Sequence, residues 1–199
     1  MDFSATDAAQ LTGLTRKTVT SIFLKIRQRI AQACERDSPL LTGEITLDEN
    51  HPEVIRAGRG RLSSSRTPVF GLLKRNGKVY TEMVPDAAKA TCQAVIRGRI
   101  APAEALAHNG GWRGYDGLVD VGYSKHLRIS HDTDQCVRSG NQIDGIESFW
   151  SFAKRRLQKF NGVAPHTFYL HLKECEWRFN MRHRDLYVEL LKLLRKHPL

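Results

Sequence analysis

Residues 143–160 read IDGIESFWSFAKRRLQKF, and this is the most informative stretch of the chain. Its apolar residues recur at steps of three and four, the period of an amphipathic helix; they are Ile146, Phe149, Trp150, Ala153, Leu157 and Phe160. The opposite face carries Glu147 and, two helical turns later, Lys154. The pattern predicts a helix that packs into a core and points a carboxylate and an ammonium group in nearly one direction.

The polar face of this predicted helix has two interpretations. Glu147 could hold a divalent metal ion, and the cations that follow it suit a phosphate chain; they are Lys154, Arg155, Arg156 and Lys159. The alternative is an ordinary solvated helix face, which is what most runs of charge are. The rest of the sequence favours the first interpretation.

The composition indicates a basic globular protein. The chain has 199 residues, 41% of them hydrophobic, which suffices for one medium-sized domain and a small appendage. Its formal net charge of +10 favours nucleic acid as a partner, although a basic protein without a polyanionic partner fits as well. No run has the length of a membrane span and the N-terminus lacks a secretion signal, so we expect a cytoplasmic protein with no membrane partner.

The four cysteines are widely spaced: Cys34, Cys92, Cys136 and Cys175. No Cys-x-x-Cys pair suggests a zinc site or redox chemistry. We therefore predict buried, reduced thiols.

The N-terminal segment predicts two helices joined by a tight turn. Ser4 and Asp7 form a capping box at the start of a short helix, which Gly13 ends. Thr15 can cap a second helix that runs to about Ala33. A helix, a glycine turn and a basic helix form the DNA-reading helix-turn-helix unit, though another helical hairpin with a glycine could match. Three residues would face the major groove or its phosphates: Arg16, Lys17 and Thr20.

Strand patterns open the rest of the chain. Residues 44–48 alternate as a strand that ends at Asp48, and residues 69–75 and 78–84 form a hairpin joined by Asn76-Gly77. Between them, the Gly-, Arg- and Ser-rich residues 51–68 predict a mobile basic loop. The remaining predictions, in order, are a helix over 86–97, a turn leading into a short strand over 102–108, a strand over 125–129, and helices over 165–180 and 185–196.

This order of elements is that of a ribonuclease H-like domain, and five segments resemble bacterial insertion-sequence transposases of the ISXO-two-like branch of the DDE class. The segments are LDE at 47–49, PVFGLLKRNGKVY at 68–80, GWRGY at 111–115, GIESFWSFAKR at 145–155 and LKECEWRFN at 172–180. The resemblance implies an α/β fold, with a ribonuclease H-like mixed sheet and flanking helices behind a small helix-turn-helix unit. We accordingly expect a DNA-binding segment over 1–36, a linker over 37–43 and the catalytic domain over 44–199.

The resemblance also implies an active site. Members of the DDE class use two Asp and one Glu to hold two divalent ions, Mg²⁺ or Mn²⁺, with a Lys seven residues after the Glu. Asp48 matches the first Asp, Glu147 the Glu and Lys154 the Lys. The implied activity is binding of double-stranded DNA at the terminal repeats, cleavage and strand transfer into target DNA, carried out by a homo-oligomer.

The sequence departs from the family at the second Asp. The family reads Ser-Asp-Gly-Trp there, whereas residues 109–112 read NGGW, so that Gly110 holds the Asp position and supplies no ligand. The nearest acids, Glu104 and Asp116, lie six residues away on either side. A second departure is the HPE of residues 51–53, where the family has Tyr-Phe-Gly.

These departures leave three hypotheses. The first is a transposase that catalyses DNA cleavage and strand transfer as the family does, in a copy whose catalysis is impaired. The second is a catalytically inactive DNA-binding protein or regulator derived from a transposase. The third is a metal-dependent nuclease of the same fold that trims DNA without strand transfer.

Overall fold

The computed structural model describes residues 3–38, 41–50, 53–54, 65–66, 69–74, 77–84, 89–109, 125–128, 143–160 and 163–199. Six helices are assigned within these ranges: α1 (Ala5–Thr12), α2 (Arg16–Arg36), α3 (Lys89–Arg99), α4 (Ile143–Gln158), α5 (Pro165–Asn180) and α6 (Leu186–Lys196). None of the described helices is long and apolar enough to cross a membrane.

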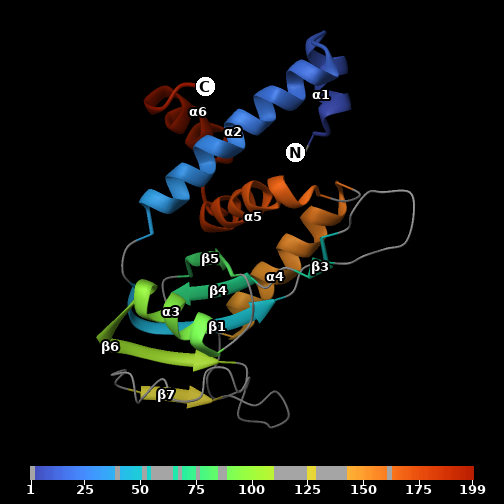
Figure 1. The fold of residues 1–199 in the computed structure, drawn as a ribbon. Coiled ribbons are helices and arrows are strands. Elements are labelled where there is room, and N and C mark those ends of the chain that lie inside the picture. The colour runs from blue at the N-terminus through green and yellow to red at the C-terminus, as the bar shows by residue number, and fades with distance from the viewer. Residues whose placement is uncertain are drawn as a thin grey trace.

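A five-stranded mixed sheet forms the centre of the main domain, in the order β5-β4-β1-β6-β7. Its strands are β1 (Leu41–Asn50), β4 (Val69–Lys74), β5 (Val79–Met83), β6 (Ile100–Asn109) and β7 (Lys125–Arg128). The first three in chain order pair antiparallel, whereas β6 pairs parallel with β1 and β7 parallel with β6. Figure 1 shows the sheet running from β5, beside α5, to β7 at the far edge. The ribonuclease H-like fold class predicted from the sequence is confirmed.

The predicted N-terminal helices are also confirmed. The Ser4 hydroxyl accepts a hydrogen bond from the Asp7 backbone N–H (3.1 Å), and the Asp7 side chain accepts one from the Ser4 N–H in return. Gly13 ends α1 with φ of +72°, a conformation that L side chains adopt at a cost. Thr15 then caps α2 by accepting from the Thr18 N–H.

The structure corrects two predictions for the sheet region. The first is the basic loop over 51–68, whose described residues instead form a two-stranded antiparallel ribbon, β2 (Glu53–Val54) with β3 (Ser65–Arg66). The second is the turn leading into a short strand over 102–108: the strand is present, but the residues expected to form the turn also belong to the ten-residue strand β6. Pro102 favours a turn locally, but the β1–β6 register shifts between the pairs Leu41–Ile100 and Gly43–Ala105, and Pro102 lies in that irregularity, where proline is tolerated in a sheet.

The main core lies between the sheet and the helices α4 and α5. The predicted apolar face of α4 is buried, with Ile146, Phe149 and Ala153 at most 2% exposed. Phe149 meets Phe179 of α5 edge to face, with ring centroids 5.4 Å apart. Burial of this stripe is what holds α4 against the sheet.

A second apolar cluster joins the N-terminal helices to the rest of the molecule. Ile30 and Cys34 of α2 pack with Trp177 of α5, and residues of α6 cover the same cluster. Figure 1 shows α2 crossing over α5, with α1 at the end remote from the sheet. The C-terminal half of α2 is therefore packed against α5 and α6.

Candidate active site and its supporting helices

The backbone brings positions 48 and 147 to the same part of the fold. Asp48 on β1 pairs with Gly71 on β4, and α4 contacts both strands. At Gly71 the helix comes so close that an added β-carbon would lie 2.7 Å from the Trp150 ring and 2.9 Å from Ile146 Cδ1. Glu147 follows Ile146 directly and is exposed. Glycine at position 71 therefore lets α4 carry Glu147 close to the end of β1.

The end of β6 lies beside this place. The parallel pairing of β6 with β1 puts Asn109 opposite Leu47, the residue before Asp48. The same register puts Ala105 opposite Gly43, so Glu104 lies at least five residues along the strand from Asp48, roughly 16 Å at the usual rise of a strand. Glu104 is thus too far away to replace the second Asp.

Gly110 and Asp116 lie outside the described residues. Within the parts of the chain that the structure describes, no group of three or more His, Cys, Asp or Glu side chains is arranged to hold a metal ion.

The outer face of α4 presents the predicted polar ridge. Glu147 and Lys154 are both exposed, as the helical spacing predicts. Arg155 is exposed as well, and its Nη1 donates to Ser151 Oγ one turn earlier (2.7 Å). Exposed carboxylate and cationic groups therefore share this face of α4.

The structure corrects the prediction that Arg156 contacts DNA. Arg156 is 4% exposed, and its Nη2 donates to Glu174 Oε1 of α5 at 2.6 Å. Its guanidinium also lies over the Phe160 ring, 5.6 Å from the centroid. On a helix, residue 156 lies on the same face as the apolar positions 153 and 157. Its side chain therefore points inward, although its neighbours 154 and 155 face solvent.

The three residues predicted to read DNA are exposed at the start of α2. They are Arg16, Lys17 and Thr20. Thr20 Oγ1 donates to the Arg16 carbonyl at 2.9 Å, which leaves the hydroxyl oxygen able to accept. Figure 1 shows that this end of α2 is remote from the sheet. The structure does not bring these residues together with Asp48 and Glu147.

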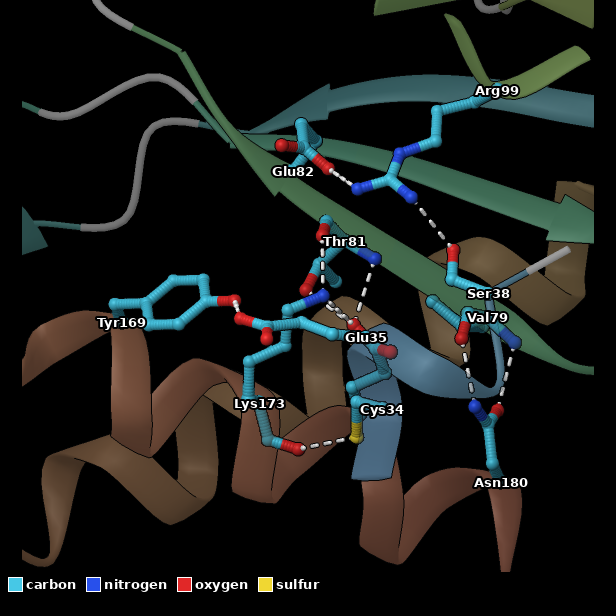
Figure 2. A network of polar contacts seen from close by, with 11 residues as sticks. Cys34, Glu35, Ser38, Val79, Thr81, Glu82, Arg99, Tyr169, Lys173 and Asn180 are labelled. Atoms are coloured by element: carbon cyan, nitrogen blue, oxygen red, sulfur yellow. Dashed lines mark hydrogen bonds and ion pairs between the residues drawn. The ribbon is translucent and has the colours of Figure 1, made fainter. Parts of the chain in front are cut away.

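Three side chains of α5 close the outer edge of β5, an arrangement that the sequence analysis missed (Figure 2). Asn180 accepts from the Val79 N–H and donates to the Val79 carbonyl, both at 2.8 Å. Glu176 accepts from the Thr81 N–H at 2.8 Å, and Lys173 donates to the Thr81 carbonyl and to Glu176, each at 2.8 Å. The side chains thus replace a neighbouring strand, and this edge is closed to pairing with another chain.

A buried cluster of charges lies on the other side of α5. Glu174 accepts hydrogen bonds from Arg27 of α2 (2.8 Å), Arg156 of α4 (2.6 Å) and Arg178 of α5 (2.9 Å to the nearer nitrogen). Burial alone would raise the pKa of the Glu174 carboxyl, but the three guanidinium groups outweigh burial and hold the pKa below its ordinary value. The cluster ties three helices together.

The spacing of 173, 176 and 180 marks one helix face, and 174 and 178 mark another. These steps of three and four residues are visible in the sequence, and they could have predicted two polar faces on α5. The partners on β5, α2 and α4 were not, because they lie far away in the chain.

Cys34 and Cys175 are buried and free, as predicted. Cys34 Sγ donates to the Lys173 carbonyl at 3.6 Å. Burial raises the pKa of the Cys175 thiol to about 11. Both thiols are packing groups with low reactivity.

The strand order and the placement of α4 on the sheet define a domain of the ribonuclease H-like class. Residues 35–180, most of the chain, match the family described as the ISXO2-like transposase domain. The chain therefore belongs to the ISXO2-like transposase family.

Known proteins similar to the chain include one relative and two solved structures. An uncharacterized transposase-like protein of Haemophilus influenzae is 43% identical over 122 residues, which cover 61% of this chain and 97% of that protein. The catalytic core domain of BIV integrase is 12% identical, with a TM-score of 0.48 over 78% of this chain and 98% of that one. A pre-cleavage Mos1 transpososome is 10% identical, with a TM-score of 0.36 over 91% of this chain and 74% of that one.

Proposed function

We propose that this chain is the DNA transposase of a bacterial insertion sequence, in a copy whose catalysis is impaired. It binds double-stranded DNA at the ends of its element, and its cleavage and strand-transfer activities are weak because Gly110 stands where the family has an Asp. The observation that supports the site most directly is the close approach of α4 to β1 and β4 at Gly71, with Glu147 next to that contact.

In this proposal Asp48 and Glu147 are the catalytic carboxylates, and they hold Mg²⁺ or Mn²⁺. Carboxylate oxygens are the ligands these ions prefer. In a complete family site, two ions supply activation of water or of a DNA 3′-hydroxyl and stabilisation of the leaving oxygen. Two carboxylates can hold one ion but not a pair, because no third carboxylate would offset the repulsion between two divalent cations. We therefore assign DNA binding to this copy and only weak chemistry.

The DNA contacts are divided between two surfaces. Arg16, Lys17 and Thr20 read the element's end, while Lys154 and Arg155 hold phosphates beside the catalytic carboxylates. In this proposal the segment 1–36 is the DNA-binding unit and 44–199 the catalytic domain, with 37–43 between them, although residues 41–43 already belong to strand β1. Because Ile30 and Cys34 pack on α5, we propose that the reading helix is held in a fixed position relative to the catalytic site.

The assembled protein acts in the cytoplasm on chromosomal DNA. We propose that it works as a homo-oligomer that brings two element ends together. Its net charge of +10 favours such an assembly on DNA, where the phosphates neutralise the repulsion between copies.

The test of this function is an assay on the DNA that flanks the gene, in two parts. The first part measures binding to the element's ends against random DNA at controlled salt concentration. The second part follows cleavage and joining with Mg²⁺ and with Mn²⁺. Preferred binding of the ends with little joining supports the proposal. Equal binding of ends and random DNA would refute end recognition.

The second candidate function is a DNA-binding protein or regulator without chemistry. Gly110 favours it, since glycine offers no metal ligand. Complete absence of cleavage and joining, even after the second Asp is restored, would select this function. Cleavage without any joining would instead select a nuclease of the same fold.

A change at the start of α2 tests the reading surface. Arg16→Ala should weaken binding to the element's end by about 1 to 3 kcal/mol if Arg16 contacts a base. The matched control is Lys25→Ala, because Lys25 is exposed on the same helix but nine residues on, on its opposite face. Both variants are measured by gel shift at fixed salt. If Arg16→Ala weakens binding to random DNA as much as binding to the element's end, Arg16 contacts a phosphate. If neither affinity changes, this helix does not read the DNA sequence.

A change on α4 tests the phosphate-binding ridge. Lys154→Ala should lose end binding and keep its melting temperature, because Lys154 is exposed and lies outside the apolar stripe. Lys192→Ala on α6 is the control, since it removes the same charge from an exposed helix away from the site. The prediction fails if Lys154→Ala melts much earlier while its folded fraction binds DNA normally.

A further inference from the structure

Cations from two helices, α2 and α6, gather in one patch where the end of α6 meets α2. Its members are Arg29 and Arg36 of α2 and Lys196 of α6, and we call them the α2/α6 patch. Arg29 Nε donates to the Pro198 carbonyl at 2.8 Å and so holds the segment after α6 against α2. Figure 1 shows this end of the chain beside α2. The candidate active site and the reading end of α2 use none of these residues.

The three cations lie close enough together to act on one imidazole. His197 directly follows α6, and partial burial lowers the pKa of its side chain. The positive charges of Arg36, Lys196 and Arg29 lower that pKa further, and no acidic group of the described chain acts on it. The imidazole is therefore uncharged at neutral pH, and the charge of the patch is that of its three cations.

The charge of the patch is not offset by neighbouring acids. Among the described residues, none of the three cations forms an ion pair, and Arg29 donates only to an amide oxygen and a backbone carbonyl. The two acids next to Arg36 in the chain are engaged elsewhere. Glu35 accepts from the Tyr169 hydroxyl of α5, and Asp37 lines a small cavity with residues of β5 and α5. The patch therefore retains its positive charge, which favours a polyanion.

The patch lies at the other end of α2 from the reading residues. From Arg16 to Arg36 the helix rises by roughly 30 Å, at about 1.5 Å per residue. At 3.6 residues per turn the two side chains also project about 160° apart, in nearly opposite directions. A duplex whose base edges face Arg16 is therefore on the other side of the helix from the patch.

We propose that Arg29, Arg36 and Lys196 bind the phosphates of a second DNA duplex, separate from the element's end. The proposal rests on the DNA-binding function proposed above and adds a second contact surface to it. In a transposase the second duplex is the target DNA, because strand transfer joins an element end to another DNA segment. Cations that contact phosphates do not read bases, so this surface binds DNA of any sequence.

The first experiment measures how the affinity of the full chain for a random-sequence duplex depends on salt, without metal. Each phosphate contact contributes about 0.9 to the slope of log affinity against log salt concentration. Arg36→Gln combined with Lys196→Gln should therefore make the slope less steep by about two. Fluorescence anisotropy over a range of salt concentrations gives the slope.

The same variants are also melted, because cations in the last turn of a helix stabilise it through the helix dipole. Arg36 and Lys196 both have this position. An effect on the dipole alone would lower the melting temperature and leave the salt slope unchanged. If the double variant does not fold, Lys196→Gln alone provides the test, with a slope less steep by about one.

The matched control is Arg97→Gln combined with Arg184→Gln. Both residues are exposed and lie outside the patch, on α3 and just before α6. This pair removes the same net charge and should leave the slope nearly unchanged. A second pair, Arg36→Lys with Lys196→Arg, should retain the slope, because a phosphate contact requires the charge and not a particular side chain.

The second experiment determines whether the patch holds a separate duplex. The chain is saturated with unlabelled duplex of the element's end, and a labelled random duplex is then added. The wild-type chain should bind both. Arg36→Gln with Lys196→Gln should bind the end normally and lose affinity for the second duplex by roughly tenfold or more. Arg16→Ala should show the reverse pattern.

Three results would each overturn the proposal. They are an unchanged salt slope in the patch variant, an equal change in the control pair, and displacement of the random duplex by the element's end. A failure of end recognition or joining would instead refute the transposase function, and the salt slopes with random DNA would still report on the patch. The two proposals are therefore tested separately.

Discussion

Glu174→Gln should lower the free energy of unfolding by about 3 to 5 kcal/mol, the usual effect of removing one partner from a buried ion pair. The Glu174 carboxylate is 7% exposed and holds three guanidinium groups together. The neutral amide would remove the negative charge on which the three groups converge. Urea denaturation measures the change, and Glu189→Gln is the control, because Glu189 pairs with Lys192 and Arg184 at the surface of α6 and its loss should have almost no effect.

The same cluster predicts how stability depends on pH. The pKa of Glu174 is lower in the folded protein than in the unfolded chain, so the unfolded chain binds the proton first as pH falls. The stabilising contribution is therefore complete above the ordinary carboxyl pKa of 4.5 and is lost as pH falls through the lower folded value. In the Gln variant this part of the acid sensitivity should disappear. An unchanged unfolding curve for Glu174→Gln would show that the cluster contributes nothing net.

Gly110→Asp should raise joining of a pre-cut DNA 3′ end by at least roughly ten- to hundredfold, the scale on which changes around a metal site alter affinity or activity. The added carboxylate would complete the set of three acids with Asp48 and Glu147, so that two ions could be held together. The measurement is strand transfer with Mg²⁺ and with Mn²⁺, together with metal affinity by calorimetry. The full increase in joining requires that the second departure from the family, HPE at residues 51–53, does not itself prevent catalysis.

Asn109→Asp is the control for this change. It adds the same charge at the last residue of β6, which pairs with Leu47, and it should not restore joining. Full activity of the chain with Gly110 in place, unchanged by the added Asp, would show that another acid is the second ligand. Asp116 is the first candidate in that case.

Local patterns predicted the helices and the hairpin well. The capping box at Ser4, the αL glycine at position 13 and the apolar stripe of α4 each involve residues within one or two turns of each other. Such features depend on interactions along the chain, and their energies are nearly independent of the rest of the fold. The hairpin of β4 and β5 is of the same kind, with Gly77 at φ of +77° in its turn.

The candidate site was predicted only in part. Positions 48 and 147 follow from the resemblance, but their proximity depends on the β1–β4 register and on Gly71, which lets α4 approach the sheet. Arg156 was assigned to DNA because its neighbours are exposed cations. Its actual partner, Glu174, lies on another helix, and no local pattern contains that pairing.

The amino-acid sequence alone was enough to indicate the family, the ribonuclease H-like order of elements and the basic charge, and to show glycine at position 110, because each is recorded in residue types and short spacings. Other features arose from contacts between distant segments. They include the long strand β6, the inward turn of Arg156, the closure of the β5 edge by Lys173, Glu176 and Asn180, and the α2/α6 patch. These features depend on packing and burial, which favour or penalise a charged or polar group according to what surrounds it in space.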